Sequence, residues 1–135
     1  MAEIKISDLS IGDWVRHTFY EENLQIKRID GESERLLVEK GRMSVSCHLD
    51  QFEPIPLTPE ILEKNGFVDG VPKGEAYKLG INDDMWLFRN DECWDFRIYY
   101  NFYSEGIILT KLWIKHTHQL QHALRLAGVE KEIEV

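Results

Sequence analysis

The sequence predicts an α+β protein, with a small N-terminal antiparallel β-barrel or curled sheet, a short linking helix, and an antiparallel sheet covered by a C-terminal helix. Three observations predict this order. Short β-patterned segments fill residues 1–57, a well-capped helix follows the prolines at 54–59, and a longer amphipathic helix lies near the end of the chain. We therefore divide the chain into a β-rich unit at 1–57 and a second unit at 58–135, with one compact domain as the alternative.

Residues 1–57 carry the pattern of short strands separated by turns. Apolar and polar alternation predicts strands at 14–19, 24–27, 36–38 and 43–47, with turns at Gly12-Asp13, Asp30-Gly31 and Lys40-Gly41. Strands of this length and spacing favour a small antiparallel barrel or curled sheet. The segment DLSIGDWV, residues 8–15, resembles the first strand of SH3-like barrels, where a Gly-Asp turn precedes an apolar strand. The resemblance implies an SH3-like barrel.

The boundaries of both helices are marked in the sequence. Thr58 has the character of an N-cap with Pro59 in the first helical position, and Asn65-Gly66 supplies a left-handed stop, so we expect a helix at 59–64. A second helix is expected at about 114–127, because apolar residues recur at helical spacing before Gly128. The apolar stripe contains Trp113, Thr117, Leu120, Leu124 and Ala127, and the opposite side, which we expect to face solvent, carries His118, His122 and Arg125.

Four strands are expected between the helices, at 76–81, 85–88, 93–100 and 107–109. Turn residues separate them at 82–84, 89–91 and 104–106. A period of two places Trp94, Phe96, Ile98 and Tyr100 on one face of the strand at 93–100. We expect this face to form the core beneath the terminal helix.

The composition is that of an acidic globular protein. The 135 residues are 43% hydrophobic and 30% charged, with a net charge of −8 that the two halves share equally. This balance disfavours nucleic-acid binding, which depends largely on neutralising phosphates. The longest apolar runs fall far short of the roughly 20 residues that span a bilayer, and the start shows no secretory signal. We expect a cytoplasmic protein with no membrane partner, in which Cys47 and Cys93 are free thiols.

Two segments form recognisable blocks, PIPLTPEILEKNGF at residues 54–67 and HQLQHAL at residues 118–124. They resemble a family of small uncharacterised proteins from anaerobic gut bacteria and their phages and mobile elements. In that family a PIPLTxxxLxxxGF block follows a β-rich start, and a terminal helix carries HQLQN before a glycine. This chain departs from the pattern at His122, where the family has Asn. The resemblance implies a phage or mobile-element context and no particular activity.

The spacing of His118 and His122 is the sharpest local pattern for chemistry. Histidines at i and i+4 on a helix can share a metal, as in HExxH zinc proteases, where the Glu is the general base. Gln119 occupies that position here and cannot take up a proton at neutral pH, so protease chemistry is excluded. His116 falls on another side of the helix. We predict no cofactor and no metal, with His118 and His122 as the candidate ligands if one is bound.

Neither cysteine has the surroundings of a reactive thiol. Cys47 and His48 are adjacent on a strand and point to opposite faces. Cys93 lies among acidic residues, whose negative charges disfavour a thiolate. The acidic turns at 82–84 and 90–92 lack the spacing of a calcium loop, and the chain has no phosphate-binding glycine loop and no G-x-S-x-G elbow. The sequence therefore assigns no catalytic residue.

The segment Tyr99-Tyr100-Asn101-Phe102-Tyr103 is the strongest sign of an interaction. Consecutive aromatics cannot all face the core from one strand, and exposed rings are typical interface anchors. We predict a non-catalytic interaction or accessory protein of a phage or mobile-element system. It would bind a protein partner, or a second copy as a homodimer, through Tyr99, Tyr100, Phe102 and Tyr103.

Two other classes remain open. The first is a hydrolase or metal-dependent enzyme whose site is assembled only by the fold, and a polar pocket holding two or more of His17, His48, His116 and His118 would favour it. The second and weaker alternative is nucleic-acid binding through the β-rich half.

Overall fold

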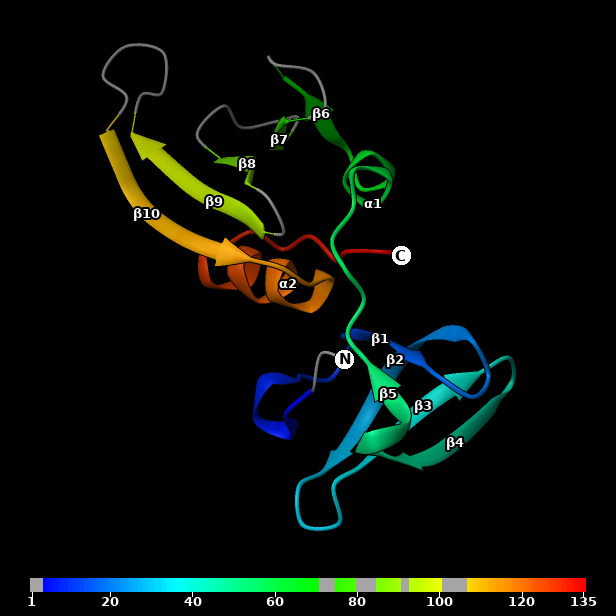
Figure 1. The fold of residues 1–135 in the computed structure, drawn as a ribbon. Coiled ribbons are helices and arrows are strands. Elements are labelled where there is room, and N and C mark those ends of the chain that lie inside the picture. The colour runs from blue at the N-terminus through cyan, green and yellow to red at the C-terminus, as the bar shows by residue number, and fades with distance from the viewer. Residues whose placement is uncertain (1–3, 71–74, 80–84, 91–92, 101–106) are drawn as a thin grey trace.

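The computed structural model contains two five-stranded antiparallel sheets and two α-helices (Figure 1). It describes residues 4–70, 75–79, 85–90, 93–100 and 107–135, with backbone alone at 99–100 and 107–112. The α+β class predicted from the sequence is confirmed.

The first sheet is a curled meander. Its strands are β1 (Trp14–His17), β2 (Glu22–Asp30), β3 (Arg35–Lys40), β4 (Met43–His48) and β5 (Phe52–Glu53), in the order β4-β3-β2-β1-β5. The first half of β2 pairs with β1 and the second half with β3, and the register shifts between Ile26 and Arg28 where the partner changes. Two 3-10 turns, η1 (Ile6–Asp8) and η2 (Leu49–Gln51), flank the meander. No closed barrel is found in the described part of the chain.

One apolar face of this sheet forms a core, as strand alternation predicts. Its buried members are Leu9, Val15, Leu24, Ile26, Leu36, Val38, Cys47 and Phe52. Cys47 is a buried free thiol, as expected, and burial raises the pKa of that thiol.

The second sheet comprises β6 (Phe67–Asp69), β7 (Ala76–Leu79), β8 (Met85–Asn90), β9 (Cys93–Tyr100) and β10 (Ile107–Ile114), in the order β10-β9-β8-β7-β6. The predicted core face is confirmed, because Trp94 and Phe96 are buried and Ile98 packs against the same cluster. The side chain of Tyr100 lies outside the described residues. Helices α1 (Pro59–Lys64) and α2 (Thr117–Leu126) contribute Leu62, Leu120 and Leu124 to this cluster.

Helix α1 has the boundaries that the sequence predicts. The hydroxyl of Thr58 accepts a hydrogen bond from the Ile61 N–H (3.3 Å), Pro59 is the first helical residue, and Gly66 takes a φ of +85° after the helix ends.

Helix α2 begins at Thr117, later than predicted, and the prediction that Trp113 belongs to its buried stripe is wrong. Strand β10 continues to Ile114, and Trp113 lies opposite Asp95 in the ladder. That register turns Trp113 to the face away from Trp94 and Phe96, so 55% of its surface stays exposed.

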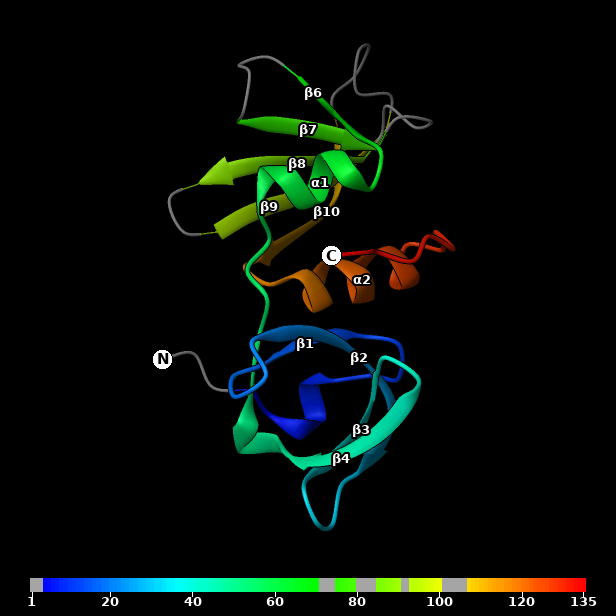
Figure 2. The ribbon, with the colours of Figure 1, turned by 90° about the vertical axis from the view of Figure 1, so that its right-hand side faces the viewer.

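Helix α2 lies between the two sheets, and the extended connector 54–58 runs from one sheet to the other beside its start (Figures 1 and 2). The connector pairs with the residues before α2. The Leu57 N–H donates to the Lys115 carbonyl (3.2 Å) and the Thr117 N–H to the Ile55 carbonyl (2.8 Å). None of the described helices has the length and apolar character needed to span a membrane.

Candidate functional site

A group of titratable side chains lies where α2 faces the first sheet. Asp13, in the turn before β1, is its centre, and its side chain is completely buried. The turn itself holds the carboxylate, because the Ser10 N–H donates to Oδ2 (2.8 Å) and the Asp13 N–H donates to the Ser10 carbonyl. Gly12 makes this turn possible with a φ of +95°. A rigid turn therefore points one carboxylate at the helix.

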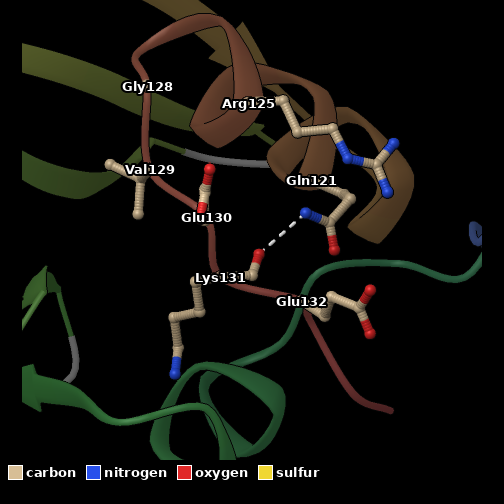
Figure 3. A pocket seen from close by; sticks show the side chains of 7 residues that line it. All are labelled: Gln121, Arg125, Gly128, Val129, Glu130, Lys131 and Glu132. Atoms are coloured by element: carbon tan, nitrogen blue, oxygen red, sulfur yellow. Dashed lines mark hydrogen bonds between the residues drawn. The ribbon is translucent and has the colours of Figure 1, made fainter.

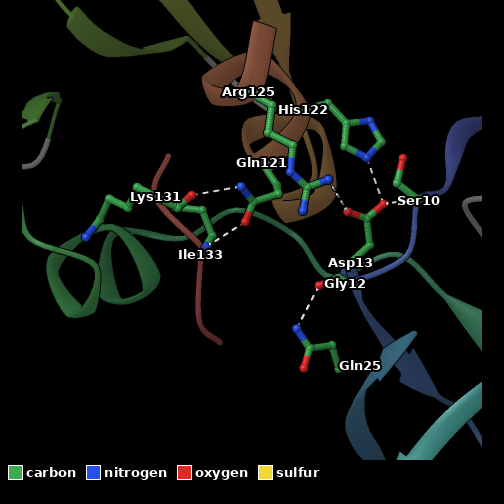
Figure 4. A network of polar contacts seen from close by, with 9 residues as sticks. All are labelled: Ser10, Gly12, Asp13, Gln25, Gln121, His122, Arg125, Lys131 and Ile133. Atoms are coloured by element: carbon green, nitrogen blue, oxygen red, sulfur yellow. Dashed lines mark hydrogen bonds and ion pairs between the residues drawn. The ribbon is translucent and has the colours of Figure 1, made fainter. Parts of the chain in front are cut away.

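Two side chains of α2 reach this carboxylate (Figure 4). Nε2 of His122 is 2.8 Å from Oδ2 of Asp13, and Nη1 of Arg125 is 3.9 Å from Oδ1. Because an ionised carboxylate can only accept, the proton of this hydrogen bond belongs to Nε2 of His122. The contact joins the first sheet to the helix that covers the second sheet.

His118 stands beside this pair and is 5% exposed, so the prediction that it faces solvent is wrong. Its ring lies 5.8 Å from the His116 ring, nearly parallel to it, and 5.8 Å from the His122 ring, nearly perpendicular. Burial lowers the pKa of His118, although Asp13 opposes the shift. Burial also lowers the pKa of His116. At neutral pH both rings are therefore uncharged.

The structure brings the candidate metal ligands His118 and His122 together, but it places no third ligand beside them in the described part of the chain. Within the residues that the structure describes, no three His, Cys, Asp or Glu side chains are placed to hold a metal ion. Nε2 of His122 is already bonded to Asp13.

Gln119, which occupies the position of the general base in HExxH helices, closes the start of α2 instead. Its Oε1 accepts from the backbone N–H groups of Lys115 (2.8 Å) and His116 (2.9 Å). The Gln119 side chain thereby satisfies two donors that precede the helix. The sequence HQLQH thus supplies structural contacts on several sides of α2.

A groove of about 530 Å³ opens beside the start of α2. Its wall is apolar and is formed by the connector and α1, including Ile55, Leu57 and Ile61. Its rim is polar and is formed by the first sheet and the approach to α2, with Arg16, Asn23, Glu53, Lys115 and His116. The groove therefore lies between the first sheet, the connector, α1 and the start of α2, and its volume is within the range of ligand pockets.

Only one of the four histidines that would favour an enzyme lines this groove. His17 is buried in the first sheet, where Nδ1 accepts from the Tyr20 N–H (3.1 Å) and the ring stacks on Tyr20. His48 is on the surface and accepts from the Asp50 N–H. The fold therefore separates His17 and His48 from the junction.

The other predicted candidates are the Cys47-His48 pair and residues whose side chains lie outside the described part of the chain. Cys47 is buried while His48 is half-exposed, so the predicted opposite orientation is confirmed. Tyr99 and Tyr100 belong to β9, but their side chains lie outside the described residues, as do Phe102 and Tyr103. The acidic turn at 82–84 also lies outside them, as do residues 91 and 92.

Sequence reasoning missed Asp13 as a junction residue, together with Asn65 and Gln121, whose amides bind the end of the chain. The Gly12-Asp13 sequence indicates a turn, but nothing in it indicates the contact of Asp13 with His122. The sequence pattern shows only that Gln119 cannot act as a catalytic base. Its capping role is hidden, because His116 is not among the usual N-cap residues.

A scan against protein-family models, a search of curated proteins and a search of solved structures each returned no match.

Proposed function

We propose that this protein is a non-catalytic interaction protein, an accessory or adaptor in a phage or mobile-element system, that binds a protein partner at the junction of its two sheets. The genetic context rests on the resemblance of residues 54–67 and 118–124 to the family of gut-bacterial proteins.

We also propose that the first sheet is a variant of the SH3-like barrel. Three features support this finer description. Strand β5 pairs with β1 after a meander of four strands, the 3-10 turn η2 stands between β4 and β5, and β2 bends to pair with different strands along its length. Barrels of this kind bind extended peptides in surface grooves.

The observation that carries the functional proposal is the groove at the junction. It joins an apolar wall to a polar rim, which is the usual anatomy of a site that binds a protein segment. Two charged residues of its lining, Arg16 and Glu53, pair with each other (3.5 Å). On α2, His122 bonds to Asp13 and the Gln119 amide caps the helix, so these polar side chains have structural contacts.

The aromatic segment at 99–103 remains part of the proposal as a second contact region. Strand β10, which follows this segment, carries the exposed ring of Trp113 on the sheet face that α1 and α2 do not cover. Large exposed rings favour contact with a partner or with a second copy.

Affinity purification from the bacterium that encodes the protein tests the proposal. Asn23→Arg places a long charged side chain at the groove rim, and Asn90→Arg makes the same change at an exposed position on β8 as a control. A partner recovered with the wild type is then purified and titrated calorimetrically. Asn23→Arg should weaken binding at least tenfold, a loss of about 1.4 kcal/mol, and Asn90→Arg should not. A partner that binds Asn23→Arg and the double variant Tyr100→Ser/Phe102→Ser as tightly as the wild type would refute the proposal.

A further inference from the structure

The terminal segment, residues 129–135, is bound to the rest of the chain as an extended peptide is bound to its receptor. It forms no helix or strand. Nε2 of Gln121 donates to the Lys131 carbonyl (2.8 Å), and Oε1 of Gln121 accepts from the Ile133 N–H (2.6 Å) (Figure 4). The Asn65 amide likewise accepts from the Glu134 N–H and donates to the Glu134 carbonyl, both at 2.7 Å. Two side-chain amides thus hold the backbone of this segment.

Between these contacts, one aliphatic side chain enters the core. Ile133 is buried in the same cluster as Leu62 of α1 and Leu120 of α2. Gln121 and Asn65 are buried as well. Both hydrogen bonds of the Gln121 amide and the one accepted by the Asn65 oxygen go to the segment, whereas Nδ2 of Asn65 also donates to the Ile61 carbonyl of α1 (2.7 Å). The site therefore recognises an extended backbone through two amides and one side chain through an apolar pocket, which is how many peptide-binding grooves work.

The connection between α2 and this bound segment is short. Gly128 has a φ of +80°, and the Val129 N–H donates to the Leu124 carbonyl (2.8 Å), so the chain is fixed to the helix as far as Val129. Beyond Val129, residues 130–132 border a hollow of about 360 Å³ beside the end of α2 (Figure 3). Release of residues 131–134 from Gln121 and Asn65 would leave every described helix and strand formed, because the segment belongs to none of them.

We propose that two copies of this chain exchange their terminal segments, so that residues 131–134 of one copy bind Gln121 and Asn65 of the other. A second copy fits because its segment is identical to the one already bound, and each site of the exchanged pair keeps its four amide hydrogen bonds to the segment and the burial of Ile133. Leu126, in the last turn of α2, is 85% exposed and supplies apolar surface for the pair to cover. A symmetric exchange of this kind is a low-cost route to a dimer. It goes beyond the proposed function and does not depend on it.

Exchange requires the segment to leave its own site first. Within one chain the segment binds at a high effective concentration, so dilute protein should remain monomeric. Refolding from urea at high protein concentration should yield more dimer than refolding at low concentration. The dimer fraction is measured by sedimentation velocity immediately after refolding.

A complementation experiment tests the exchange directly. Asn65→Ala/Gln121→Ala keeps the segment and loses the site, whereas Ile133→Ser keeps the site and loses the anchoring side chain. Each variant refolded alone should be monomeric. One lacks the two amides of the site, and in the other the loss of the buried isoleucine weakens binding of the segment to the site by at least about tenfold. The two variants refolded together should give a heterodimer, and a mixture that stays monomeric overturns the proposal. A wild-type dimer that survives Ile133→Ser but is lost in Tyr100→Ser/Phe102→Ser overturns it in favour of the aromatic segment.

Cross-linking provides a second test without substitutions in the core. Nζ of Lys64 donates to the Val135 carbonyl (2.8 Å), so these two positions mark the site and the segment. In a Cys93→Ser background, chains with Lys64→Cys are refolded together with chains carrying Val135→Cys, and a short bis-maleimide is added. Covalent dimer should form at several times the yield of a control mixture of Lys64→Cys and Glu32→Cys chains. Equal yields overturn the exchange.

Discussion

Replacing Asp13 by alanine tests whether the junction contact holds the two sheets together. The carboxylate is fully buried and has hydrogen bonds with the Ser10 N–H and His122, each 2.8 Å long. A hydrogen bond to a charged group contributes about 1.5–3 kcal/mol to stability. Both partners can regain some water when the carboxylate is removed, because Ser10 and His122 are partly exposed. We therefore expect Asp13→Ala to lower the free energy of unfolding by about 3 kcal/mol.

Equilibrium urea unfolding at neutral pH measures this loss, and a double-mutant cycle with His122→Ala isolates the pair. The coupling energy should be about 1–2 kcal/mol, and Asp13→Asn should cost less than Asp13→Ala because an amide oxygen still accepts hydrogen bonds. Glu32→Ala, at an exposed turn, serves as the control and should change stability by no more than about 0.5 kcal/mol. A zero coupling energy, or an Asp13→Ala that is as stable as the control, would show that the contact does not hold the junction.

Four further predictions concern the core, the buried histidine, the terminal segment and metal content. Leu124→Ala should cost about 2–5 kcal/mol in urea unfolding because Leu124 is fully buried, whereas Leu126→Ala should be neutral. Because burial lowers the pKa of His118, the unfolded chain takes up this proton first as the pH falls below its ordinary value of 6.5. The free energy of unfolding should therefore fall as the pH decreases through that range. It should fall less in His118→Gln than in His48→Gln, and an equal dependence of this free energy on pH in the two variants would contradict the burial of His118. Gln121→Ala should cost about 1–3 kcal/mol by leaving the buried Ile133 N–H without its acceptor, and faster amide exchange at that N–H is the accompanying measurement. Untagged protein should contain less than one equivalent of zinc by elemental analysis, and its Tm should not change on chelation, since a bound metal would raise it by mass action.

The parts of the fold that the sequence predicts well are those that depend on neighbouring residues. Helix α1 was predicted with its correct bounds because Thr58, Pro59 and Gly66 each act within one turn of it. The core face of β9 was predicted for a similar reason, since alternation is a property of the strand itself. The four strands of the first meander were found, although β2 and β3 are longer than their apolar segments because hydrogen-bonded pairing extends beyond the pattern.

The parts that the sequence could not predict depend on contacts between distant segments. Helix α2 is buried on two sides, and its second side is polar, so the apolar pattern assigned His118 and His122 to solvent. Nothing near Asp13 in the sequence indicates that its partner lies on the last helix. Residues Gln121 and Asn65 were equally hidden, because a buried amide that binds backbone has no periodic signature.

The pairing of the connector with the start of α2 has a consequence for how the chain folds. The hydrogen bonds from Leu57 to Lys115, and from the Trp94 indole N–H to the Leu57 carbonyl (3.0 Å), join segments from opposite halves of the chain. Closing so long a loop is slow, because its entropy is lost before the contacts form. We therefore expect the first meander to form early from local pairings and the second sheet to consolidate only once the connector docks. A fragment that begins at Thr58 would lack both bonds. We expect it to fold slowly and incompletely, and to aggregate readily.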